Sequence, residues 1–172
     1  KSVGFFHEKK KGVDRVFVDH PDFLAKVWGK TGSKLYGEKS GYDFADNQDR
    51  FAMFCHAAIK APMALTDLGY GEDVIFVAND WHSALVPVIL NKVMKPAGQF
   101  TKAKCAMTIH NIAFQGRFCP KPMAAYGLPD SAADDFFFED GYSKVYDETN
   151  PAKEDGKEEF DGKIYRKANW LK

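Results

Sequence analysis

Two short runs of the chain gather side chains that can bind polar ligands. Residues 79–82 (NDWH) follow the apolar run 74–78, and residues 110–111 (HN) follow the apolar run 105–109. Carboxylate and amide groups pair with hydroxyls, an imidazole donates or accepts a hydrogen bond, and an indole can stack on a sugar ring. This set of side chains therefore suits a sugar.

Each of these side chains also has a structural interpretation. Asp80 could simply cap the helix that follows it. Trp81 could pack over the sheet, and His110 and Asn111 could satisfy backbone groups in a buried turn. Two polar strand ends that meet at one edge favour a binding site over these alternatives.

Other chemistries have less support in the sequence. Glycosidases use two Asp or Glu residues, whereas Asp80 is the one carboxylate that this pattern places. A zinc site made of Asp80, His82 and His110 is a weaker alternative, because their spacing matches no compact zinc motif. The sequence has no Walker motif, no GxGxxG and no GxSxG. A nucleotide site within this chain therefore has no motif support, and we expect no metal and no cofactor.

A strand–helix–strand unit must position these residues. The runs 74–78 and 105–109 are apolar without alternation, which predicts strands covered on both faces. Residues 83–94 carry apolar side chains at helical spacing, and Pro96 and Gly98 end the pattern. A helical crossover makes the two strands parallel, so their carboxyl ends lie at the same edge of the sheet. The predicted fold class is α/β.

Away from this unit, the expected elements are short. A strand is predicted over residues 13–18, and a longer helix with one apolar stripe is predicted to begin at Asp46 or Asn47. Short helices are expected at residues 22–27, 121–126 and 131–138. Loops or turns are expected at residues 1–11, in the glycine-rich stretch 28–43 and in the middle of the charged run 144–163. The last ten residues are expected to begin a helix.

Composition narrows the classes of function. The 172 residues are 45% hydrophobic, which is enough for a sizeable core, and the formal net charge is zero, so bulk charge does not favour a nucleic-acid partner. No apolar run approaches the roughly 20 residues of a membrane span, so we expect no membrane partner. The first residues lack a targeting signal and an initiator Met, and we expect the sequence to begin inside a longer protein.

Two segments together resemble a known enzyme family. ANDWHSALVPVIL (residues 78–90) and TIHNIAFQGRF (residues 108–118) are similar to the starch and bacterial glycogen synthases, which are retaining glucosyltransferases of the GT-B fold. Residues 12–37 are most similar to the granule-bound type of plants and green algae. The likeness runs from about Val3 to Asp140 and resumes at residues 168–172.

The resemblance implies a place in a two-domain enzyme. Residues 1–172 would form part of its N-terminal Rossmann-like domain, a parallel sheet with flanking helices, and residues 147–162 would be a mobile charged insertion. The enzyme would move glucose from ADP-glucose to an α-1,4-glucan on the starch granule, in the plastid. The C-terminal domain, which would hold most of the ADP-glucose, is absent from this sequence, so the chain alone is expected to be inactive.

The same resemblance implies roles for individual residues. His110 would contact the transferred glucose, binding and polarising it without acting as a nucleophile, and Asp80 would line the cleft beside it. The substrate-binding residues would be Tyr36, Trp81, His82, Asn111 and Gln115. Two alternatives remain open: a soluble starch synthase or glycogen synthase, and a glucan-binding module without catalysis.

Overall fold

The strand–helix–strand unit forms as the sequence predicts. In the computed structural model, which describes residues 1–39, 42–118, 120–144 and 158–172, β5 (Ile75–Asn79) pairs in parallel with β6 (Lys104–Thr108). The chain between these strands passes through η3 (Trp81–Ser83), α3 (Leu85–Ile89) and the π-helical turn η4 (Leu90–Met94). The predicted α/β class with a parallel sheet is confirmed.

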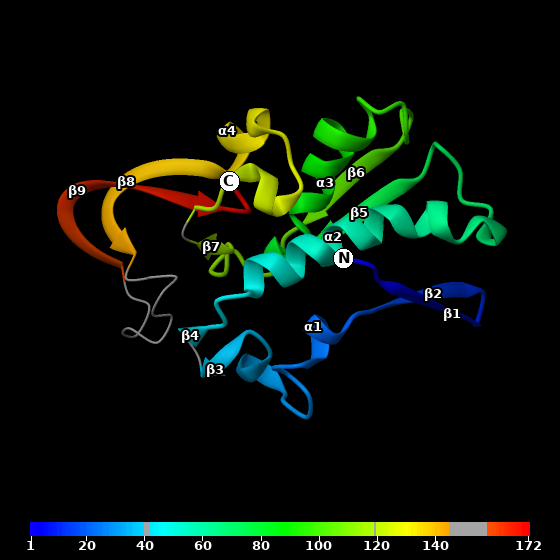
Figure 1. The fold of residues 1–172 in the computed structure, drawn as a ribbon, viewed down its shortest axis with the longest axis horizontal. Coiled ribbons are helices and arrows are strands. Elements are labelled where there is room, and N and C mark those ends of the chain that lie inside the picture. The colour runs from blue at the N-terminus through cyan, green and yellow to red at the C-terminus, as the bar shows by residue number, and fades with distance from the viewer. Residues whose placement is uncertain (40–41, 119, 145–157) are drawn as a thin grey trace.

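The longest helix, α2 (Asn47–Ala64), lies between this unit and an N-terminal hairpin (Figure 1). It begins directly after Asp46, as predicted, and Asp49 in its first turn complements the positive end of the helix dipole. Pro62 lies inside the last turn, and the helix ends two residues later at Ala64. Because α2 faces α3, it covers the side of the unit opposite to the sheet.

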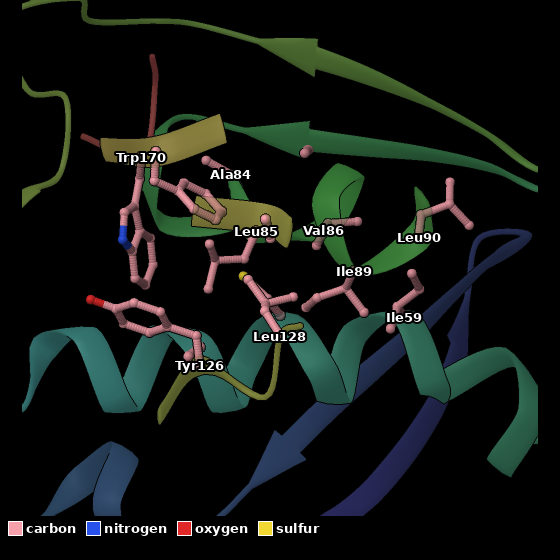
Figure 2. Packing of buried hydrophobic residues seen from close by; sticks show 14 of the residues in the cluster. Ile59, Ala84, Leu85, Val86, Ile89, Leu90, Tyr126, Leu128 and Trp170 are labelled. Carbon is pink, nitrogen blue, oxygen red and sulfur yellow. The ribbon is translucent and has the colours of Figure 1, made fainter. Parts of the chain in front are cut away.

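The hydrophobic core fills the space between α2 and α3. Ile59 of α2 and Leu85 and Ile89 of α3 are fully buried, and Figure 2 shows the α3 side chains pointing towards α2. Tyr126, which ends the 3-10 helix η5 (Met123–Tyr126), packs against Trp170 at one end of this layer. The helix α3 therefore packs between α2 and the β5–β6 pair.

Two larger antiparallel groups of strands lie outside this parallel unit. β1 (Gly4–Lys10) and β2 (Val13–Asp19) form the hairpin, and the short helix α1 (Pro21–Leu24) follows it. A second sheet has the order β7-β9-β8 and curves away from the helices (Figure 1). Its strands and neighbouring short elements are β7 (Arg117–Phe118), η6 (Asp130–Ala132), α4 (Ala133–Phe136), β8 (Phe137–Lys144) and β9 (Glu158–Asn169).

Between the hairpin and α2, the chain forms two further small elements. These are the 3-10 helix η1 (Gly32–Leu35) and the strand pair β3 (Gly37–Lys39) and β4 (Tyr42–Asp43). After α2, the 3-10 helix η2 (Thr66–Leu68) leads into β5. In the part of the chain that the structure describes, no helix combines the length and the apolar character needed to cross a membrane.

The loop expected at residues 1–11 is a strand for most of its length. Its charged composition suggests a loop, but opposite charges face each other across the hairpin: Glu8 pairs with Arg15, and Lys9 with Asp14. Their charged groups lie 3.8 and 3.7 Å apart. Opposite charges on directly paired residues stabilise an antiparallel ladder, so the pairing outweighs the local composition.

The prediction of a helix over the last ten residues is also wrong, because residues 163–169 belong to β9 and the chain then ends in a turn. The backbone of β9 pairs with β8 and, near its end, with β7. Most of the charged insertion expected at residues 147–162 lies outside the described residues. From Glu158 onwards that stretch is strand rather than loop.

The expectation that β5 is covered on both faces is not met in the described chain. Phe76 and Ala78 face the core, whereas Ile75 and Val77 are 66% and 60% exposed. The helix α3 covers one face of the pair, and α2 packs on the far side of α3. The apolar run therefore predicts the strand correctly, but it does not show whether the face that carries Ile75 and Val77 is covered.

Leu85 provides a test of the α2–α3 core. Leu85→Ala is expected to lower the free energy of unfolding by about 2–5 kcal/mol, because the fully buried side chain leaves a cavity. The matched control is Leu24→Ala in α1, where the side chain is 45% exposed and the expected change is under about 0.5 kcal/mol. Urea unfolding measures both, and equal effects would contradict this core.

Candidate functional site

The carboxylate of Asp80 joins the segments that follow the carboxyl ends of β5 and β6. The Asp80 N–H donates to the carbonyl of Thr108 at 2.8 Å and extends the parallel ladder by one residue. Its Oδ1 then accepts hydrogen bonds from the backbone N–H of His110 at 2.7 Å and of Asn111 at 3.3 Å. Residues 30 positions apart in the sequence are thus held together at one edge of the sheet.

The backbone of Asp80 adopts a conformation that favours glycine. Its φ of 53° and ψ of −177° lie in a region that costs other residues of the order of 1–3 kcal/mol. Asp80 precedes η3, but its side chain makes no capping hydrogen bond there, so the capping alternative is wrong. The His110 N–H, with a smaller contribution from Asn111, holds the pKa of the Asp80 carboxyl below its usual value.

The exposed imidazole of His110 contacts Asn79, a residue to which the sequence pattern assigns no separate role. Its Nε2 lies 2.9 Å from Oδ1 of Asn79, the last residue of β5. Asn79 stands at the same strand exit as Asp80, and that position was the available signal for its role. The sequence alone does not show which polar residue at a strand exit faces the neighbouring strand.

Asn111 and Gln115 shape the loop after His110. Oδ1 of Asn111 accepts a hydrogen bond from the N–H of Ala113 at 3.1 Å. The Gln115 amide donates to the carbonyl of Ile112 at 3.0 Å and accepts from Asn169 of β9 at 2.8 Å. Gln115 thus ties the loop to the second sheet, and its predicted contact with substrate stays a prediction.

The remaining predicted residues form an aromatic cluster next to Asp80. The His82 ring stacks on Trp81, with 4.0 Å between the ring centroids, and its centroid lies 4.9 Å from that of Tyr36. The Phe51 ring of α2 packs edge-on against Trp81, with 4.9 Å between the centroids. Trp81 is 7% exposed, as the packing alternative expects, and offers little surface for a sugar. Its contribution is to hold the η3 turn in place.

His82 is held in this cluster as a half-buried ring. Burial lowers the pKa of His82, although the nearby Asp80 charge acts in the opposite direction. Its Nε2 is buried and has no hydrogen-bond partner among the described residues. A neutral imidazole fits that environment better than a charged one.

The structure therefore separates the predicted residues by position. Asp80, His110 and Asn111 lie together at the sheet edge, Tyr36, Trp81 and His82 form the packed cluster beside them, and Gln115 lies at the far end of the loop. At the edge, the carboxylate of Asp80, the imidazole of His110 and the amides of Asn79 and Asn111 can form hydrogen bonds with hydroxyl groups. Within the described ranges, no group of three or more His, Cys, Asp or Glu side chains could hold a metal ion.

Gly116 closes the loop directly over Trp81. Its φ is +64°, and a Cβ at this position would lie 2.8 Å from Cε3 of the indole. Real Cβ atoms do not approach other atoms so closely, and the Trp81 ring cannot move without disturbing the cluster around it. The loop that carries His110 can therefore return to β7 at this level only with glycine.

Comparisons with known proteins agree on one family. The sequence model of the family described as "Starch synthase catalytic domain" matches residues 1–158. Granule-bound starch synthase 1 of Pisum sativum is 54% identical over 84% of this chain and 25% of its own length. The proteins of the same name from Ipomoea batatas and Manihot esculenta are 49% and 48% identical and cover 99% and 100% of this chain.

This chain spans about a quarter of the length of these relatives. Among solved structures, the catalytic domain of Starch Synthase IV from Arabidopsis thaliana bound to ADP and acarbose covers 73% of this chain and 22% of its own. The sequence identity in that match is 25% and the TM-score is 0.49.

Gly116→Ala tests the close contact with Trp81. The matched control is Gly98→Ala, since Gly98 has a φ of +75° but no atom within 4 Å of an added Cβ. The control carries the conformational cost alone, about 1–2 kcal/mol, and Gly116→Ala is expected to cost about 1–3 kcal/mol more through overpacking. Unfolding curves and the near-ultraviolet circular dichroism of the aromatic side chains report the result. Equal costs for the two variants would show that the Trp81 indole can move aside without a loss of stability.

Proposed function

The chain belongs to the starch synthase catalytic domain family, and on that premise we propose that it forms one wall of the sugar cleft of an α-1,4-glucan synthase. The observation that carries the proposal is the hydrogen bond from the His110 N–H to Asp80. It sets an exposed imidazole beside a carboxylate at the carboxyl edge of a parallel sheet, where α/β proteins bind ligands.

In this proposal, His110 binds and polarises the glucose that is transferred. Its ring is exposed, whereas its backbone is tied to Asp80, so the imidazole can meet a ligand without losing its position. Asp80 already accepts two backbone N–H groups through Oδ1. A carboxylate engaged in this way suits a positioning role better than that of a nucleophile.

The reaction proposed is the transfer of glucose from ADP-glucose to the non-reducing end of an α-1,4-glucan. The bond between the anomeric carbon and the phosphate oxygen breaks, and a bond from that carbon to the acceptor hydroxyl oxygen forms. ADP leaves with the bonding electron pair, and its phosphate oxygen takes up the proton that the acceptor hydroxyl loses. The configuration at the anomeric carbon is retained, and no side chain of this chain needs to form a covalent intermediate.

The rest of the catalytic machinery is proposed to lie outside this sequence. The relatives are about four times as long as the matched segment, and we propose that a second domain of the GT-B fold holds most of the ADP-glucose. Residues 1–172 would then form part of the N-terminal domain and would not catalyse transfer alone. The relatives' names give chloroplast and amyloplast locations, so the proposed site of action is the starch granule in the plastid.

A chimera tests this function. The present chain replaces the matching segment of the Manihot esculenta enzyme, which aligns with all of it, and incorporation of glucose from ADP-glucose into amylose is measured. Misplacing a substrate in an active site can cost about 10² in rate, and His110→Ala is expected to cost a similar factor. The matched control is His7→Ala, whose imidazole pairs with Asp14 in the hairpin, and it should leave the rate unchanged.

The outcomes of this experiment distinguish the proposed role of His110 from the alternative of a glucan-binding module. A His110→Ala chimera that keeps near-normal activity would contradict the role proposed for His110. If the unsubstituted chimera folds and binds amylose but transfers no glucose, the alternative of a glucan-binding module is favoured. Co-sedimentation with amylose, measured on the same samples, separates these cases.

A further inference from the structure

We infer that Asn79 is a positioning residue that keeps the His110 imidazole in the tautomer with the proton on Nε2. The sugar would then meet Nδ1 as a hydrogen-bond acceptor. The inference rests on the proposed function for its consequence, but the tautomer itself is a property of this chain and can be measured without substrate.

The orientation of the Asn79 amide follows from its two neighbours. Its Nδ2 lies 3.4 Å from the carbonyl oxygen of Val77 and donates to it, so Oδ1 faces Nε2 of His110 at 2.9 Å. A flipped amide would set Oδ1 against the Val77 oxygen, and two acceptors would face each other. Because Oδ1 only accepts, Nε2 must carry the proton.

The backbone of Asn79 is held as firmly as its amide. The Ser83 hydroxyl accepts from the Asn79 N–H at 2.6 Å and donates to the Asn79 carbonyl at 2.7 Å. Asn79 also pairs with Thr108 in the parallel ladder. The last residue of η3 and the end of β5 therefore fix the residue that faces His110.

His110 is consequently held at two points, and one ring nitrogen remains for a ligand. Its backbone N–H is bound to Asp80, and its Nε2 is bound to Asn79. In the neutral ring, Nδ1 then carries a lone pair and accepts a hydrogen bond. Such a nitrogen selects a hydroxyl, which donates, over a carbonyl or ether oxygen, which cannot.

Nitrogen NMR of the 172-residue chain tests the tautomer directly. At about pH 8, above the ordinary titration range of histidine, His110 should show a protonated Nε2 and a non-protonated Nδ1. In Asn79→Leu the two nitrogen shifts should move towards each other, as both tautomers become populated. Asn79→Asp, which keeps an oxygen opposite Nε2, should retain the original pattern.

The matched control is Asn91→Leu, an exposed asparagine of η4 in the same strand–helix–strand unit. It should leave the His110 shifts unchanged. A protonated Nδ1 in the unsubstituted chain, or the same shifts with and without the Asn79 amide, would overturn the inference. Amide spectra of each variant establish that the chain remains folded.

Kinetics of the chimera test the consequence for catalysis. A lost hydrogen bond of ordinary strength corresponds to a fall of about three- to tenfold, and we expect that loss in kcat/KM for ADP-glucose with Asn79→Leu. The KM for amylose should stay unchanged, and Asn79→Asp should restore most of the activity. A purely structural role would lower kcat/KM for ADP-glucose and raise the KM for amylose together, and would allow no rescue.

The failures of the two proposals can be told apart. If the unsubstituted chimera is inactive while the NMR pattern is as expected, the proposed function fails and the tautomer assignment stands. If the chimera is active and needs His110, but Asn79→Leu changes neither the shifts nor kcat/KM, the inference about Asn79 fails alone.

Discussion

The carboxylate of Asp80 joins two strand exits that the sequence keeps 30 residues apart. Its Oδ1 accepts hydrogen bonds from the backbone N–H groups of His110 and Asn111. These bonds hold the chain that follows β6 beside the end of β5. Hydrogen bonds to a charged acceptor are worth more than neutral ones, about 1.5–3 kcal/mol. That range is comparable to the conformational cost of the Asp80 backbone, about 1–3 kcal/mol, so the interaction offsets the strain of the turn.

The packing beneath this edge explains why the turn cannot relax. Trp81 follows Asp80 directly and is enclosed by Phe51, His82 and Phe118. Gly116 touches the same indole from the loop side. A rotation of the Asp80 backbone would have to move a buried tryptophan, and a close-packed interior resists such a movement. The aromatic cluster thus supports the sugar-binding edge without offering much of its own surface to a ligand.

The part of the fold that local sequence determines was predictable, and the part that depends on distant pairing was not. The apolar runs of β5 and β6 and the stripe of the helix between them indicate the parallel unit, and hence the meeting of Asp80 with His110. Strand β9 could not be predicted, because the pairing of Phe137 with Ala168 is decided by contacts far along the chain. The same limit applies to Asn79: its residue type and place at a strand exit are visible, but the direction of its amide depends on Val77 and His110.

Amide hydrogen exchange at His110 tests the interaction on which the edge depends. In the unsubstituted chain the His110 N–H should exchange slowly, although the residue is exposed, because it is bound to Asp80 at 2.7 Å. In Asp80→Ala its exchange should rise towards the rate of an unprotected loop amide, while Asp80→Asn, which keeps an acceptor oxygen, should retain part of the protection. Equal exchange in the unsubstituted chain and in a folded Asp80→Ala variant would show that Asp80 does not hold the two strand exits together.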